Sequence, residues 1–384
     1  MSSPLLPLLA LLASLLALTP QSAVASPMPV DLLGARGIFG PDKVEAITLH
    51  NALALSTKGS SGCLVDGVVT ARYSHNNAIL AGTARVAFKA VGLLAKTPEQ
   101  KAQFNYVTPF FYQKGSDDAS VACTIGNATN QASVAAGEHG ISSTPFTLTG
   151  TDCSSQALPL SSSSAPGLAG AQVQVLQETG FTVISDIDDT IKITEVNDKA
   201  KALQNTLINP FRATTGIVDF YARLRTSLNA DFIYLSGSPH MLYTPLRDFM
   251  RSVGLPAGSL FLNVFGLGLS DLDFYKGSQV HKLKVLRSLL PKYSKRSYVL
   301  VGDSAEQDPE TYGIIYNEFA AQGVDFKCIY IHKVVGVNPG MEATLNTDDR
   351  FAAAFKGVPK EKVFVYSDPS QIPSTADIKN GKCF

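Results

Sequence analysis

The arrangement of apolar and polar residues differs between the two halves of the chain. After residue 170, short apolar runs alternate with longer stretches in which apolar side chains recur at helical spacing. The short runs predict strands at 181–185, 232–236, 260–264, 298–301 and 326–331, and the longer stretches predict helices at 217–228, 241–253, 280–290 and 309–322. This alternation is typical of βαβ units, so we expect an α/β domain with a parallel sheet and helices on both faces over residues 171–384.

The residues before 154 have a different pattern. Runs at 64–73, 84–93 and 106–112 are β-branched or aromatic and are separated by Gly, Asn and Ser clusters, which is typical of strands and turns. We therefore expect a smaller, mainly β N-terminal domain over residues 26–153. Residues 154–170 lack periodicity and are rich in Ser, Pro and Gly, which predicts a linker between the two domains.

The first residues predict a signal peptide. An apolar run at 5–18 is followed by Ala23-Val24-Ala25, a small-residue pattern of the kind that signal peptidase cleaves. The run is shorter than the roughly 20 apolar residues that a spanning helix needs, so we interpret residues 1–25 as a signal peptide and not as an anchor. We expect a secreted mature chain, extracellular or at the cell surface, that starts at Ser26 and has no transmembrane segment.

Composition narrows the classes of function. The chain has 384 residues and 45% hydrophobic content, enough for a globular protein with a sizeable core. Its 32 basic and 32 acidic residues leave no net charge, so we expect no nucleic-acid partner. The sequence does not indicate an oligomeric state.

If the chain is secreted, we expect disulfides among its five cysteines, because oxidising compartments favour disulfide formation. Cys328 lies in an apolar strand pattern, so we expect it to be a buried free thiol. At least one disulfide is then drawn from four cysteines whose pairing the sequence leaves open: Cys63, Cys123, Cys153 and Cys383. Asn127 lies in an Asn-Ala-Thr acceptor, so it is a candidate for glycosylation.

Residues suited to phosphate chemistry follow three of the predicted strands. The first strand ends in Asp186-Ile187-Asp188, the second in Ser236-Gly237-Ser238-Pro239, and the fourth in Gly302-Asp303, with Asp308-Pro309 shortly after. Open parallel sheets bind ligands beyond the carboxyl ends of their strands, so these side chains are expected to meet. There, one carboxylate of the Asp-x-Asp pair can attack phosphorus and the other can transfer a proton.

Each motif also has a plain structural reading. Asp-x-Asp can be a polar turn, Ser236 to Pro239 can be a turn, and Asp308 before Pro309 is a good helix N-cap. Their order, each after a predicted strand, favours a catalytic site. The carboxylates of Asp303 and Asp308 are the hard oxygen ligands that Mg²⁺ prefers.

The ordered set resembles the haloacid dehalogenase superfamily, whose remaining motif is a Lys. Lys282 supplies it, with Lys284 as the competitor. More narrowly, Ser-Asp-Ile-Asp-Asp-Thr-Ile-Lys, Tyr-Leu-Ser-Gly-Ser-Pro and Gly-Asp-Ser-Ala-Glu-Gln-Asp-Pro-Glu-Thr-Tyr resemble the catalytic domain of the actin-patch-type phosphatidate phosphatases of fungi. The similarity runs from about Gly180 to about Tyr366 and leaves the N-terminal domain uncovered.

The resemblance implies a role for each residue. Asp186 would be the nucleophile and Asp188 the general acid and then base, while Ser236 would hold the phosphoryl oxygens and Lys282 would offset negative charge. The implied magnesium ligands are Asp186, Asp188, Asp303 and Asp308. The chain departs from the family at one position: His240 follows Ser238-Pro239, where the family has a Trp. This chain contains no Trp. We expect His240 to face solvent from a helix.

Two intervals that carry cap domains in many relatives are short here, between Thr194 and Asp231 and between Val264 and Lys282. We therefore expect a capless, open cleft. The apolar residues Leu267, Leu269, Leu272 and Phe274 are candidates for contact with a membrane or for an ordinary packed loop. The leading hypothesis is a secreted phosphatidate or lipid-phosphate phosphatase acting at a membrane surface. The alternatives are a secreted phosphomonoesterase for phosphoproteins or soluble esters and a catalytically idle module that binds phospho-ligands.

Overall fold

The computed structural model describes residues 36–37, 40–41, 46–59, 62–76, 94–111, 113–115, 120–125, 131–135, 140–149, 156–161, 171–264, 277–372 and 375–384. Four features expected from the sequence lie outside these residues: the signal peptide, the strand at 84–93, the acceptor Asn127 and the apolar residues between 267 and 274. They remain predictions.

The C-terminal half is built on a six-stranded sheet in which all neighbouring strands are parallel. Its order is β13 (Gly258–Asn263), β12 (Asp231–Pro239), β11 (Phe181–Ser185), β14 (Ser297–Asp303), β15 (Asp325–His332) and β16 (Val363–Tyr366). The five predicted strands are all present, so the mixed α/β fold with a parallel sheet is confirmed. The edge strand β16 was not predicted.

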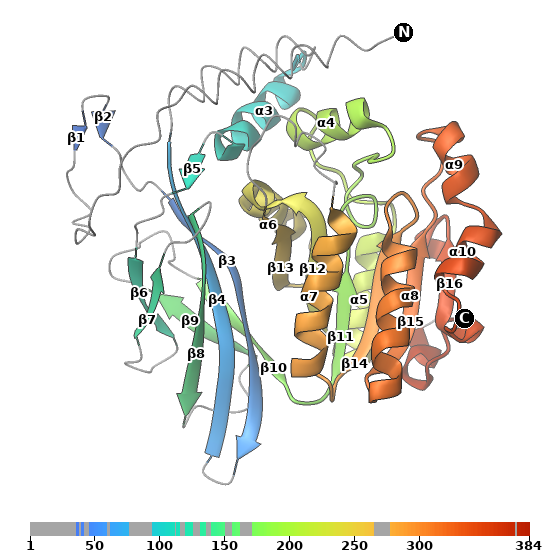
Figure 1. Cartoon of the computed structure of the whole chain (residues 1–384). Coiled ribbons are helices and arrows are strands. Elements are labelled where there is room, and N and C mark those ends of the chain that lie inside the picture. The colour runs from blue at the N-terminus through green and yellow to red at the C-terminus, as the bar shows by residue number, and fades with distance from the viewer. Residues whose placement is uncertain are drawn as a thin grey trace.

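Helices cover both faces of this sheet (Figure 1). They are α4 (Lys199–Leu207), α5 (Ile217–Leu228), α6 (Tyr243–Ser252), α7 (Ser278–Lys292), α8 (Asp308–Phe319), α9 (Pro339–Leu345) and α10 (Asp348–Ala354). Short 3₁₀ segments lie at η3 (His240–Leu242), η5 (Ala320–Gln322), η6 (Lys360–Lys362), η7 (Pro369–Gln371) and η8 (Thr375–Asn380). The four predicted helices are confirmed, whereas α4, α9 and α10 were not predicted.

Successive strand residues pack into opposite cores, as the two-residue period of a strand requires. In β11, Val183 belongs to the core that contains α5 and α6, and Ile184 belongs to the core that contains α7 and α8. Both residues are fully buried. A strand buried on both faces reads as a continuous apolar run, which is why these strands were visible in the sequence.

The N-terminal half forms a second sheet, in the order β5 (Gln113–Gly115), β4 (Gly62–Asn76), β3 (Ala46–Gly59), β10 (Ala171–Gln177), β9 (Ala157–Ser161), β6 (Ser120–Ile125) and β7 (Gln131–Ala135), with β8 (Ile141–Thr149) also paired to β4. The short strands β1 (Arg36–Gly37) and β2 (Gly40–Pro41) pair with each other. Apart from the pairing of β10 with β3, the pairs in this sheet are antiparallel.

The segment between the two sheets differs from the predicted linker. Strand β9 lies inside residues 154–170, and β10, which the sequence predicts to belong to the α/β domain over residues 171–384, pairs with β3 and β9 of the N-terminal sheet. Leu158 and Leu160 are buried while their neighbours Ala157, Pro159 and Ser161 are exposed. This short alternation specifies a strand even in a Ser- and Pro-rich stretch.

The aromatic run at 106–112, expected to be a strand, is instead the end of helix α3 (Pro98–Phe111). Tyr106 and Phe110 stack edge to face one helical turn apart, with ring centroids 5.9 Å apart. The Tyr106 hydroxyl also donates to Asp248 of α6 at 2.5 Å. Packing against the C-terminal half thus overrides the β propensity of the aromatic residues.

Two side chains join the sheets. The buried guanidinium of Arg296 donates to the carbonyls of Gln177, Thr179 and Phe181 at 2.6–2.9 Å, which fixes the turn from β10 into β11. Gln174 of β10 donates to the Phe232 carbonyl at 3.1 Å and accepts from the Ser259 amide at 2.8 Å. The N-terminal sheet is therefore hydrogen-bonded directly to the parallel sheet.

Cys328 is not a free thiol, as the sequence had suggested. It forms a disulfide with Cys383, with a Cα–Cα distance of 5.6 Å, and both residues are buried. An apolar strand pattern predicts burial but not the oxidation state, because a disulfide buries as well as a thiol. Cys63 is also disulfide-bonded.

Within the described residues, no helix is both long enough and apolar enough to span a bilayer.

Candidate active site

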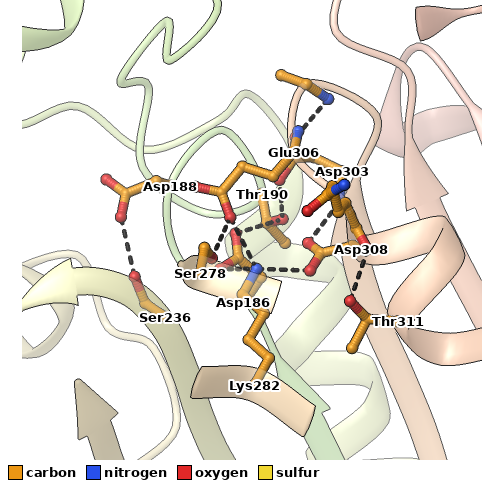
Figure 2. Close-up of polar contacts among 12 residues, drawn as sticks. Asp186, Asp188, Thr190, Ser236, Ser278, Lys282, Asp303, Glu306, Asp308 and Thr311 are labelled. Atoms are coloured by element: carbon orange, nitrogen blue, oxygen red, sulfur yellow. Dashed lines mark hydrogen bonds and ion pairs between the residues drawn. The ribbon is translucent and has the colours of Figure 1, made fainter. Parts of the chain in front are cut away.

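The predicted site residues converge at the carboxyl end of the parallel sheet (Figure 2). Asp186 follows β11, Ser236 lies in β12, and Asp303 ends β14, so they come from three neighbouring strands. Asp308 begins α8, and Lys282 reaches the site from α7. These five residues are at most 1% exposed, so the site is buried.

Three carboxylates form the centre of the site. One ligand oxygen from each of Asp186, Asp303 and Asp308 lies within 4.8 Å of the others. The ammonium of Lys282 pairs with Asp186 Oδ1 at 2.9 Å and with Asp308 Oδ1 at 2.5 Å. The competitor Lys284 is exposed and is not part of this cluster.

A fourth carboxylate, that of Glu306, adjoins the cluster and was not among the predicted site residues. Its Oε2 accepts from Ser278 at 2.7 Å and from Lys282 at 3.1 Å. Its Oε1 is buried and has no hydrogen-bond partner among the described residues. Glu306 therefore adds negative charge beside Lys282, its ion-pair partner among the described residues.

The electrostatics of this cluster favour a bound cation. Burial and then the neighbouring carboxylates raise the pKa of Asp303 well above its ordinary value, and burial raises the pKa of Asp186 in the same direction although Lys282 opposes it. For Lys282, burial lowers the pKa, but the three carboxylates around it outweigh burial and raise it well above its ordinary value. The cluster thus contains four buried carboxylates, three of them paired with the Lys282 ammonium, and a divalent cation would compensate the remaining negative charge.

The donor set fits a hard divalent metal. Asp186, Asp303 and Asp308 offer carboxylate oxygens only, and the described residues place no Cys or His in the group. Carboxylate oxygens are typical ligands of Mg²⁺, which usually keeps several waters. The hydroxyl of Thr190 lies 3.2 Å from Asp186 Oδ2 and 3.4 Å from Asp303 Oδ2, and it orients both.

Asp188 lies apart from the triad and points towards Ser236 (Figure 2). Its Oδ2 accepts from Ser236 at 3.0 Å and from Ser238 at 2.6 Å, and its Oδ1 accepts from Thr194 at 2.7 Å and pairs with Lys192 at 3.4 Å. Burial raises the pKa of Asp188, but Lys192 and the three hydroxyls outweigh it and lower the pKa below its usual range. Asp188 was expected to be a metal ligand as well, yet these four partners occupy both oxygens.

The third aspartate of the Asp186 loop has a structural role that sequence reasoning did not assign. Asp189 adopts a positive φ of 57°, and its carboxylate accepts from the amides of Thr194, Glu195 and Val196 at 2.6–2.8 Å. An aspartate tolerates this left-handed conformation better than most side chains. It folds the loop so that Thr194 reaches Asp188.

The acidic loop after β14 is held from outside by Arg350 of α10. Its guanidinium donates to the carbonyls of Ser304 and Glu306 at 2.6 Å each and pairs with Glu310 at 2.7 Å. These contacts fix the backbone between Asp303 and Asp308. No local motif pointed to Arg350, because its partners are mostly backbone atoms distant in the sequence.

Two further neighbours of Asp188, Ser238 and Lys192, lie in or beside the sequence motifs but were not among the predicted site residues. Ser238 stood in the Ser-Gly-Ser-Pro motif and Lys192 followed the Asp-rich loop. Both touch Asp188, through 2.6 Å and 3.4 Å contacts. His240, expected to face solvent, is only 3% exposed because η3 continues directly from β12 into the core.

The site is also less open than the short intervals predicted. The interval between Thr194 and Asp231 contains α4 as well as α5, and α4 and α3 lie at the carboxyl end of the sheet (Figure 1). Asn205 of α4 donates to the carbonyl of Thr194 at 3.2 Å, which ties this helix to the loop that follows β11. The motif spacing did not reveal α4.

Comparison with known proteins agrees with this geometry. Residues 181–333 match the family described as the phosphatidate phosphatase APP1 catalytic domain. An uncharacterized protein of Schizosaccharomyces pombe is 33% identical over 155 residues, and the phosphatidate phosphatase APP1 of Saccharomyces cerevisiae is 32% identical over 146 residues. The aligned regions cover 39% and 37% of this chain and 24% of each relative.

The chain thus spans about a quarter of the length of these curated relatives. No solved structure matches it. The matched residues begin with β11 and end just after β15, so they contain the whole carboxylate cluster and Lys282. Residues 181–333 are a catalytic domain of the APP1 phosphatidate phosphatase type.

Proposed function

We propose that this protein is a secreted, Mg²⁺-dependent phosphatidate phosphatase with a haloacid-dehalogenase-like fold. The observation that carries the proposal is the buried triad of Asp186, Asp303 and Asp308, joined by Lys282, at the carboxyl ends of adjacent parallel strands. The match of residues 181–333 supports phosphatidate as the substrate, because the matching yeast protein is named for that activity.

The proposed reaction proceeds in two displacements. A carboxylate oxygen of Asp186 attacks phosphorus, the bond from phosphorus to the glycerol oxygen breaks, and that oxygen takes a proton from Asp188 to leave diacylglycerol. Water then attacks the phosphorus of the aspartyl phosphate and gives its proton to Asp188, which releases inorganic phosphate and restores Asp186. Splitting the hydrolysis in this way replaces one difficult step by two easier ones.

The surroundings of Asp188 fit the second displacement best. Lys192 and the hydroxyls of Thr194, Ser236 and Ser238 hold it as a carboxylate, the form that accepts a proton from water. Donation to the leaving oxygen requires the protonated form. If the substrate phosphate accepts the hydrogen bonds of Ser236 and Ser238, Asp188 loses these two donors. Its pKa would then rise, which favours the protonated form of Asp188.

The remaining groups of the site position the reacting groups and neutralise negative charge. Asp186, Asp303 and Asp308 would hold the metal, which, when bound, offsets the charge on the transferring phosphoryl group and orients it for in-line attack. Lys282 contributes a fixed positive charge beside Asp186. Thr190 keeps the Asp186 carboxylate oriented through its 3.2 Å hydrogen bond.

Secretion is the second part of the proposal. It is supported by the apolar run at 5–18 with the Ala23-Val24-Ala25 pattern and by the Cys328–Cys383 disulfide, which is typical of oxidising compartments. Secreted material is expected to begin at Ser26 and to have a mass lower by two hydrogens for each disulfide. Intact mass with the leader retained, or free thiols at Cys328 and Cys383, would contradict this part.

The activity is tested by phosphate release from phosphatidate, glycerol phosphate and a phosphopeptide, each with Mg²⁺ and with chelator. We expect phosphatidate to be hydrolysed with Mg²⁺ only. Asp186→Asn should retain less than about one part in a hundred of the activity, while the exposed Asp219→Asn retains it. Hydrolysis of the phosphopeptide or glycerol phosphate alone would favour the soluble-ester alternative, and no hydrolysis of any substrate would favour a binding module.

A further inference from the structure

A groove of about 760 Å³ runs between the N-terminal sheet and the catalytic domain. Strands β3 and β4 contribute Leu53 and Val68 to one wall, and β13 and α7 contribute Leu262, Val285 and Leu289 to the other. The groove lies between these strands of the N-terminal sheet and helix α7. The two sheets that form its walls are hydrogen-bonded to each other through Gln174 and Arg296.

The lining combines an apolar floor with a cationic edge. Most of the side chains that line it are aliphatic or aromatic, whereas Lys284 and Lys292, which also line it, are exposed residues of α7. Lysine stems extend apolar surface while their ammonium groups stay in water. Such a surface is suited to an amphiphile that has a long apolar body and carries negative charge.

Helix α7 connects the groove to the reaction centre. Lys282 and Ser278 of this helix contact Asp186 and Glu306, while Val280, Lys284 and Val285 line the groove. One end of the groove is formed by Asn263, Val264 and Gly277, at the end of β13 and the start of α7. That end of the groove therefore lies at the carboxyl end of the parallel sheet, as Asp186 does.

We propose that this groove binds an acyl chain of the lipid phosphate whose phosphate is hydrolysed at Asp186. The inference rests on the proposed function and deepens it, because it assigns the apolar part of the substrate to a place on the protein. The volume lies within the 300–1,000 Å³ range that is typical of small-molecule sites. Val280, 71% exposed, and Val264, 46% exposed, leave apolar surface uncovered that a chain would bury.

Remote contacts of this kind raise catalytic efficiency only for substrates that possess the chain. Ser288, an exposed residue of α7 that lines the groove, allows the groove to be filled without disturbing the core. The variant Ser288→Trp introduces a large ring there. Ser294→Trp is the matched control, since Ser294 is exposed just after the same helix and is not among the lining residues.

The experiment measures kcat/KM on dioleoyl phosphatidate in mixed micelles and on glycerol phosphate, together with binding of the fluorescent fatty acid cis-parinarate in chelator. Ser288→Trp should lower kcat/KM on dioleoyl phosphatidate at least about tenfold, as expected from the loss of about two buried methylene groups. It should leave glycerol phosphate hydrolysis unchanged and abolish saturable cis-parinarate binding. Val280→Asp should act in the same direction, and Ser294→Trp should behave as wild type.

The outcomes separate the two proposals. If wild type hydrolyses phosphatidate but Ser288→Trp and Val280→Asp match it in both measurements, the groove assignment is wrong and the proposed function stands. If the wild-type protein releases no phosphate from phosphatidate, the proposed function is wrong. The groove then loses its substrate assignment, whether or not cis-parinarate binds.

Discussion

The ammonium of Lys282 lies 2.9 Å from Oδ1 of Asp186, and both side chains are buried. The same ammonium lies 2.5 Å from Asp308, so a single cation holds together the proposed nucleophile and a proposed metal ligand. Removing one partner of a buried ion pair leaves an uncompensated charge, which is far more costly than losing an exposed pair.

We therefore predict that Lys282→Met lowers activity at least about a hundredfold, because fixed charge beside the reacting phosphate is lost. It should also lower the free energy of unfolding of the metal-free protein by about 3–5 kcal/mol. Phosphate release and denaturant unfolding measure the two effects. Lys295→Met is the control, since its ion pair with Glu178 is largely exposed. Activity above about a tenth of wild type would contradict a role for Lys282 in the reaction.

The raised pKa values of Asp303 and Asp186 predict a link between pH and metal binding. A carboxyl group whose folded pKa is raised binds more protons in the folded state than in the unfolded state, so its ionisation destabilises the fold as pH rises above about 4. A divalent cation binds the ionised form. We predict that the Mg²⁺-induced increase in melting temperature grows as pH is raised from about 5 to about 7.5.

Calorimetry with Mg²⁺ and with chelator at several pH values measures this dependence. Asp303→Asn, which removes one titrating carboxylate, should make the Mg²⁺ effect smaller and less dependent on pH. An increase in melting temperature that is largest at acidic pH would have the wrong sign for a site made of carboxylates with raised pKa values.

Gly302 is required by close packing and not by backbone conformation. A Cβ atom built on Gly302 would lie 2.5 Å from Oδ2 and 2.6 Å from Cβ of Asp308, distances that side chains do not tolerate. We predict that Gly302→Ala displaces Asp308 and weakens Mg²⁺ binding by about tenfold or more, as loss of support for a ligand usually does. Titration of the activity with Mg²⁺ measures this change in affinity. Gly340→Ala is the control, because a Cβ atom built on Gly340 would lie 3.6 Å from the nearest atom. Equal Mg²⁺ requirements would contradict this packing argument.

The sequence predicted the catalytic half better than the N-terminal half for a physical reason. Strands such as β11 and β14 are buried on both faces and appear as apolar runs, and the proposed site residues lie directly at their ends. Helix α3 was misread because its aromatic residues pack on the catalytic half, a tertiary contact that local propensity cannot encode.

Within the site, the predicted residues were those whose chemistry is visible in a local motif. Glu306 and Arg350 were missed because their importance arises from contacts across the fold, with Lys282 for the first and with the Ser304 carbonyl for the second. Of the partners of Asp188, Ser236 was predicted as a site residue, whereas Ser238, Thr194 and Lys192 were not. Ser238 lies 50 residues after Asp188 in the sequence and meets it because β11 and β12 are neighbours in the sheet.

The disulfide between Cys328 and Cys383 ties the end of the chain to β15, across a sequence separation of 55 residues. A cross-link of this length restricts the unfolded chain, and the chain-entropy relation predicts a stabilisation of about 4 kcal/mol. We predict that Cys383→Ala lowers the free energy of unfolding by up to this amount, while activity at low temperature persists because neither cysteine contacts the carboxylate cluster. Denaturant unfolding and phosphate release measure the two quantities.

The double variant Cys328→Ala/Cys383→Ala separates loss of the cross-link from exposure of a lone thiol, since it should be destabilised to a similar extent. Thiol titration of the unfolded wild-type protein without reductant should detect neither cysteine. Unfolding of both variants at the wild-type denaturant concentration would show that the cross-link is not formed in the native protein. That result would also remove one of the two supports for an oxidising compartment, because a reduced Cys328 is compatible with any location.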